Sequence, residues 1–129
     1  MTLRLGTAMP PLSGGTEWVN SEPLDSDQLL GKPVLVHFWA LSCHSCHGMM
    51  PTILQWHAEY APRGLQMIAV HQPRMETDMD VDAVRREVAE YGITYPVVVD
   101  NEQMIGRAWD NRFVPSFFVF DRDGKLRHY

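Results

Sequence analysis

The sequence predicts a single α/β domain over residues 1–129, in which helices flank a mixed sheet with parallel strands at its core and an antiparallel hairpin at its end. Short apolar runs rich in valine, isoleucine and aromatic residues alternate with segments in which apolar residues recur every three or four positions. The runs are continuous rather than alternating, which is typical of strands covered on both faces. A chain of 129 residues can bury one continuous core.

The N-terminal segment predicts an arm. Residues 6–33 are interrupted repeatedly by proline and glycine, and between the breaks they contain a short strand over 17–20 and a helical turn over 26–30. We expect this segment to form an arm or small hairpin that covers one edge of the domain.

The next segment predicts a strand–helix–strand unit. Buried strands are expected over 34–39 and 65–71. The helix between them is indicated by apolar-face spacing and should be bent by Pro51; its face comprises Met50, Ile53, Leu54, His57 and Ala61. A crossover of this length makes the two strands parallel and the unit right-handed.

The second half of the chain predicts a further helix and strand and then a hairpin. The helix covers 80–91, with Asp80 as its cap and Gly92 at its end, and a buried strand follows over 95–100. A short helix is expected over 103–110, with four residues inward: Met104, Ile105, Ala108 and Trp109. The hairpin comprises a strand, a tight turn and a partner strand, at 116–120, 121–124 and 125–129.

Composition excludes several classes of function. The formal net charge is -5 and no basic cluster exceeds Arg85-Arg86, which argues against nucleic acid as a partner. No apolar run approaches the roughly 18 residues that a membrane-spanning helix needs, and none resembles a signal peptide at the N-terminus. The default expectation is a cytoplasmic monomer.

Both cysteines of the chain lie in one motif, Cys43-His44-Ser45-Cys46, between the strand over 34–39 and a helix. The free N–H groups and the dipole at a helix N-terminus stabilise a thiolate, so Cys43 should be activated. Cys46 lies one turn further in, within reach of a disulfide. Two cysteines are too few for a disulfide scaffold, so the pair indicates redox or metal chemistry.

Other interpretations of the same motif are weaker. With His47 it reads C-x-x-C-H, the attachment motif of c-type haem, but a buried strand and a Pro-bent helix are not the usual setting of that motif. Zinc is disfavoured because four ligands within five residues cannot easily surround a tetrahedral ion. A peroxiredoxin-like thiol peroxidase would need Thr or Ser three positions before its cysteine, where this chain has Ala40 and Cys43. We therefore expect no metal and no cofactor beyond a redox-active disulfide.

Several motifs in combination resemble the thioredoxin superfamily: Phe38-Trp39-Ala40, then Cys43-x-x-Cys46, Pro51, Val114-Pro115 before an apolar strand, and an Asp-Gly turn. The arm, the Gly31-Lys32-Pro33-Val34 lead-in and the helix and strand inserted at roughly 80–100 resemble the TlpA/ResA-like thiol–disulfide oxidoreductases, in a soluble bacterial branch.

The resemblance implies a role for each matching residue. Cys43 would attack a target disulfide, and Cys46 would resolve the mixed disulfide and leave the pair oxidised. Pro115 would be the cis-proline facing the cysteines, Val114 would pair its backbone with an extended substrate segment, and Trp39 would pack beneath the active loop. The implied partners are protein or peptide thiols and disulfides and an upstream electron donor. A reducing compartment would make the protein a reductase.

Four departures from the family pattern affect these expectations. Ser42 stands where thioredoxin has tryptophan, so the substrate platform should be smaller and more polar. His37 replaces a buried acid, and Met49 replaces the glutamate of ResA-like proteins, which weakens an inference to cytochrome c maturation. The family normally continues beyond this hairpin with another helix, so we expect the natural gene to continue.

Three polar residues are candidates for tuning the cysteine pair. His37 is either a satisfied core histidine or a proton relay for Cys46. His44 is either a solvated loop residue or a group that stabilises the Cys43 thiolate and lowers its pKa. Ser45, between the cysteines, completes the set.

Overall fold

The computed structural model describes residues 3–129. Within these residues the strands are β1 (Glu17–Val19), β2 (Val34–Trp39), β3 (Gln66–His71), β4 (Val97–Val99), β5 (Ser116–Phe120) and β6 (Leu126–His128). The α-helices are α1 (His44–Tyr60), α2 (Val81–Tyr91) and α3 (Met104–Ala108), and the short 3-10 turns are η1 (Ser26–Leu29), η2 (Ala61–Arg63) and η3 (Glu76–Met79).

The strands form one mixed sheet in the order β1-β4-β3-β2-β5-β6. The inner pairs β2–β3 and β3–β4 are parallel, whereas β5 runs antiparallel to β2 and pairs with β6 in the terminal hairpin. The predicted fold class is therefore confirmed. The arm does not form its own hairpin, because β1 pairs with the distant β4 at the sheet edge.

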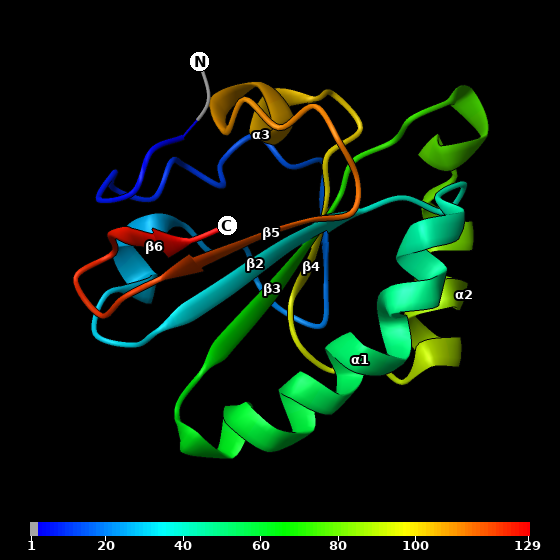
Figure 1. Ribbon diagram of the computed structural model, residues 1–129. Helices are drawn as coiled ribbons and strands as arrows, with labels where there is room; N and C mark the ends of the chain where they lie inside the picture. The colour runs from blue at the N-terminus through cyan, green and yellow to red at the C-terminus, as the bar shows by residue number, and fades with distance from the viewer. Residues whose placement is uncertain (1–2) are drawn as a thin grey trace.

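Helices cover both faces of the sheet (Figure 1). In that view α1 and α2 lie on one side, and α3 lies with the N-terminal segment on the other. Each face has its own buried cluster. Met50 and Ile53 of α1 and Val84 of α2 belong to one cluster, and Ile105 of α3 and Leu12 of the arm belong to the other. Every residue of β2 is buried, which explains its continuous apolar run.

The course of α1 follows its sequence. Cys43 is the N-cap, in an extended conformation, and its side chain accepts a hydrogen bond from the backbone N–H of Cys46. Pro51 lies inside the helix and lacks the backbone N–H that the helical ladder would use. The axis of α1 changes direction along its length in Figure 1, in agreement with the predicted bend.

The structure corrects the expectation for the short helix before the hairpin. Met104 is 46% exposed and Ala108 is also exposed, so only Ile105 and Trp109 face inward. Met104 covers the backbone of Gly14 in the arm, where a Cβ atom on the glycine would lie 2.8 Å from that of Met104. The neighbouring arm, which no local spacing reveals, sets the orientation of this helix.

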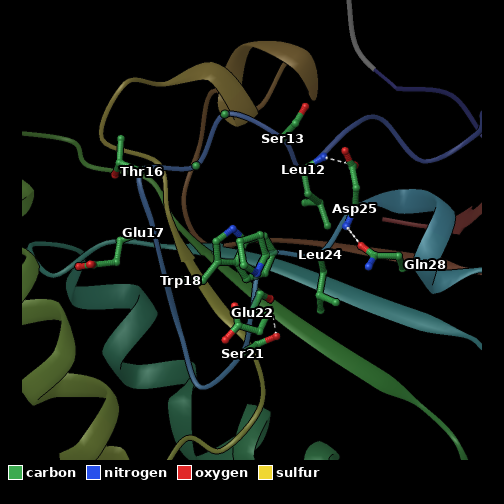
Figure 2. Close-up of a pocket in the computed structure, with 13 residues that line it drawn as sticks. Leu12, Ser13, Thr16, Glu17, Trp18, Ser21, Glu22, Leu24, Asp25 and Gln28 are labelled. Atoms are coloured by element: carbon green, nitrogen blue, oxygen red, sulfur yellow. Dashed lines mark hydrogen bonds between the residues drawn. The ribbon is translucent and has the colours of Figure 1, made fainter.

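The surface of the described domain has several hollows, including two large ones. A pocket of about 590 Å³ lies in the arm (Figure 2), where the carboxylate of Asp25 accepts a hydrogen bond from Leu12 N–H and the backbone N–H of Asp25 donates to Gln28 Oε1. No predicted site residue lines this pocket. An apolar groove of about 430 Å³ lies between α1 and the β2–β5 face, and Trp56 and Phe117 line it.

Candidate functional site

The two cysteines form a disulfide at the start of α1, with their Cα atoms 5.2 Å apart. Cys46 is 1% exposed and belongs to the core cluster beneath α1, whereas Cys43 is only half-buried. The N–H of Cys46 donates to Cys43 Sγ at 3.1 Å. A sulfur at a helix N-terminus that accepts a backbone N–H is stabilised as a thiolate once the disulfide opens.

Val114 and Pro115 lie at the same end of the sheet as the cysteines. Strand β5 is antiparallel to β2, and Ser116 at its start pairs with Phe38 near the end of β2. The residues just before β5 therefore lie at the edge from which the chain leaves β2 toward Cys43. The Val114–Pro115 peptide bond is cis, and Val114 packs against both core clusters.

Trp39 ends β2 and lies in the same buried cluster as Cys46. It is 1% exposed, and its ring meets the ring of His71 edge-on, with centroids 4.9 Å apart. Its position in the core next to the loop that carries Cys43 agrees with the packing role that the resemblance implies.

His37 lies on the same sheet face but contacts other groups. Its Nε2 is 2.9 Å from the hydroxyl of Tyr95, and its ring stacks on Phe117. Burial lowers the pKa of His37 to about 3, so the imidazole is neutral at neutral pH. Within residues 3–129, no hydrogen bond joins His37 to either cysteine sulfur. These contacts favour the core-histidine interpretation over a proton relay.

The other two tuning candidates lie at the surface. His44 and Ser45 form the first positions of α1 and are exposed to solvent beside the half-buried Cys43. Ser42, on the other side of Cys43, is exposed as well, so the surface around the reactive sulfur is polar.

Sequence reasoning missed three polar residues that contact the loop before Cys43. His47 lies 2.7 Å from the carbonyl oxygen of Leu41, and His71 accepts from the N–H of Leu41. Asp78 accepts from Ser42. Asp78 and Ser42 are 36 positions apart, so no local pattern pairs them. The sequence did contain one signal for Asp78: it is an acidic residue in a loop that follows a parallel strand, and binding sites of α/β proteins lie at the carboxyl ends of such strands.

Across residues 3–129, no three His, Cys, Asp or Glu side chains come together as a metal-binding group. Over the same range, no helix has the length and apolar character needed to cross a membrane.

The mixed sheet, and the disulfide between a half-buried and a buried cysteine at the start of α1, define a thioredoxin-like thiol–disulfide oxidoreductase. The model of the AhpC/TSA family matches residues 6–129, and the chain belongs to that family.

Similar proteins agree with this class. The chain is 40% identical over 128 residues to the thiol-disulfide oxidoreductase YkuV of Bacillus subtilis, covering 98% of this chain and 85% of YkuV. It is 31% identical over 108 residues to the thiol-disulfide oxidoreductase ResA of Bacillus anthracis, covering 84% of this chain and 60% of ResA. The solution structure of a thioredoxin-like protein in the oxidised form has a TM-score of 0.89 at 40% identity, covering 98% of this chain and 84% of that one.

One similar protein is much longer than this chain. The chain is 36% identical over 126 residues to the protein DipZ of Mycobacterium tuberculosis, covering 95% of this chain but spanning only 18% of DipZ.

Proposed function

We propose that this protein acts as a reductase of protein disulfides, with Cys43 as the attacking nucleophile and Cys46 as the resolving thiol. The observation that carries the proposal is the unequal exposure of the two sulfurs. Cys43 is half-buried and capped by a helix N–H, whereas Cys46 is 1% exposed. Only the first is accessible to a large substrate, and only the first has the local stabilisation that a thiolate nucleophile requires.

The reaction balances as two successive exchanges. The Cys43 thiolate attacks one sulfur of the substrate disulfide, a Cys43–substrate bond forms, and the substrate bond breaks to give a thiolate that takes a proton. Cys46 then loses its proton and attacks Cys43 Sγ, which forms the Cys43–Cys46 disulfide and releases the second substrate thiol. The protein loses two electrons and the substrate gains them, so a dithiol donor must reduce the protein again.

The substrate segment is proposed to lie along Val114 and Pro115. These residues precede β5 at the sheet edge near Cys43, and a proline there has no N–H to donate. The backbone of Val114 then supplies the hydrogen-bonding groups for an extended peptide, as in strand addition. The proposed setting is a reducing compartment such as the cytoplasm, where a dithiol form is maintained.

Trapping of the mixed disulfide tests the assignment of the two sulfurs. A Cys46→Ser variant should form a stable mixed disulfide with a model protein that contains a disulfide bond, because the variant has no second thiol to resolve this intermediate. A Cys43→Ser variant should form far less adduct, since Cys46 is buried. Equal trapping by both variants, or trapping only by Cys43→Ser, would reverse the assignment.

Equilibration against a glutathione series tests the direction. A reduction potential close to that of thioredoxin, about -270 mV, is expected of a reductase, whereas a potential of about -120 mV would indicate an oxidant. A value at the oxidising end would overturn the reductase proposal and leave the exchange chemistry intact.

The disulfide is proposed as the sole redox group. In the structure the two sulfurs of the C-x-x-C-H motif bond to each other, and His47 Nε2 and Nδ1 lie 2.7 Å from Leu41 O and 2.6 Å from the Tyr91 hydroxyl. The disulfide and the two contacts of His47 support thiol–disulfide exchange rather than haem attachment. A Soret band in the purified protein would contradict the proposal, and turnover of hydrogen peroxide at a rate matching disulfide reduction would favour a peroxidase instead.

A further inference from the structure

Asp78 joins the loop before the nucleophile to a distant part of the chain. Its carboxylate accepts the N–H of Ser42 at Oδ1, at 2.9 Å, and the hydroxyl of Ser42 at Oδ2, at 2.7 Å. Asp78 is 1% exposed and lies in η3, after β3. Because Ser42 immediately precedes Cys43, these bonds hold the backbone that carries the reactive sulfur.

The same carboxylate also organises its own loop. It accepts the backbone N–H groups of Arg74, at 2.8 Å, and of Met75, at 3.3 Å. Burial raises the pKa of Asp78, but these bonds together with those from Ser42 outweigh burial and hold the pKa below its ordinary value. At neutral pH the negative charge of Asp78 is therefore held against Ser42, the residue that precedes Cys43.

Two histidines hold the other side of the loop through Leu41. The N–H of Leu41 donates to His71 Nε2 at 3.1 Å. The carbonyl of Leu41 can only accept, so His47 Nε2 donates to it at 2.7 Å. The loop is thus anchored at consecutive residues by side chains from β3, α1 and η3, and the anchor from η3 is the carboxylate of Asp78.

We propose that Asp78 is a positioning residue for thiol–disulfide exchange. Its carboxylate fixes Ser42, and with it the direction from which Cys43 Sγ approaches a substrate disulfide, and its charge opposes the Cys43 thiolate. This inference rests on the proposed function. In this proposal Asp78, a buried acid in η3 and outside the C-x-x-C motif, positions the nucleophile Cys43.

An Asp78→Asn substitution weakens both the positioning and the charge effect, and a rate constant and a pKa measure the two separately. The amide keeps the shape but presents one acceptor oxygen, so at least one bond to the loop is lost together with the charge. The rate constant for reduction of a protein disulfide, measured where Cys43 is fully ionised, should fall about tenfold, because small misplacement of a reacting atom is costly. The pKa of Cys43, followed by thiolate absorbance, should fall by about half a unit when a unit charge nearby is removed.

Asp80→Asn is the matched control. It removes the same charge two positions along the chain, from an exposed N-cap whose bond to the N–H of Ala83 asparagine can replace. Its rate constant and Cys43 pKa should stay at wild-type values. Asp78→Glu, which retains the charge, should restore the Cys43 pKa toward the wild-type value even where the rate remains low.

The proposal is overturned if folded Asp78→Asn has the same Cys43 pKa as the wild type. It is also overturned if Asp80→Asn shifts the Cys43 pKa as much as Asp78→Asn does. If Asp78→Asn does not fold, Ser42→Ala carries the test, because it removes only the hydroxyl bond. A rate loss of about fivefold, as expected for one hydrogen bond, supports the proposal, and an unchanged rate overturns it.

Failure of the proposed function gives a different result. If wild-type protein reduces no protein disulfide, the reductase assignment fails, yet the Cys43 pKa of the three variants still reports on Asp78. Alkylation of Cys43 by iodoacetamide across pH provides that readout without any protein substrate.

Discussion

His37 is an ionisable side chain that the fold keeps neutral. It is 1% exposed, and burial lowers its pKa to about 3. Burial also raises the pKa of Tyr95, so the tyrosine remains a hydroxyl, and its oxygen forms a hydrogen bond with His37 Nε2 at 2.9 Å. The pair is a satisfied polar contact inside the α1 face of the sheet. With so low a pKa, the His37 ring is a weak base and is poorly suited to accept the proton of Cys46 at neutral pH.

A His37→Gln variant tests whether that neutral ring takes part in catalysis. The pH dependence of disulfide reduction should be the same as in the wild type between about pH 6 and pH 9, because His37 does not ionise there. Loss of an ionisation from that profile would instead identify a proton relay. Tyr95→Phe serves as the comparison: it should lower the free energy of unfolding by about 1–3 kcal/mol by leaving His37 Nε2 unpaired.

Two glycines in different elements illustrate how packing decides the effect of one methyl group. A Cβ on Gly15, just before β1, would lie 2.2 Å from Cγ2 of Val98, which is fully buried. A Cβ on Gly48, in the second turn of α1, would have no atom within 4 Å. The arm thus approaches β4 closely at a position that only glycine fits.

Alanine at these two positions should therefore have opposite effects on stability. Gly15→Ala should lower the free energy of unfolding by about 1–3 kcal/mol through overpacking against Val98. Gly48→Ala should raise it by about 0.5–1 kcal/mol, since alanine is the better helix former. Urea denaturation of both oxidised variants measures the changes. Stabilisation by Gly15→Ala would show that β1 does not pack against β4 as described.

Elements whose signal is local were predictable from the sequence, and those defined by distant partners were not. The apolar run of β2, the cap at Asp80 and the end at Gly92 predict their elements because neighbouring residues determine them. The pairing of β1 with β4 joins residues about 80 positions apart, and nothing in the arm specifies it. For the same reason the cysteines were identifiable from their spacing, whereas the anchor at Asp78 required the fold to bring it to Ser42.

At the scale of the whole molecule, two buried histidines on adjacent strands link stability to pH. Burial lowers the pKa of His37 to about 3 and the pKa of His71 to about 4; the nearby Asp78 charge only partly offsets the effect at His71. In the unfolded chain both histidines would titrate at about 6.5. Between those values the unfolded state binds protons that the folded state refuses, so stability falls as the pH falls.

The wild-type protein should therefore lose stability on acidification, and about 2 kcal/mol of the loss between pH 7.5 and pH 5 should come from His37 alone. The contribution is fully present above the unfolded pKa and disappears as the pH falls toward the folded value. Urea denaturation at the two pH values measures it as the difference between wild type and His37→Gln. His128→Gln, at an exposed position in β6, should keep the full wild-type loss. An equal loss in wild type and His37→Gln would mean that His37 accepts a proton inside the folded domain.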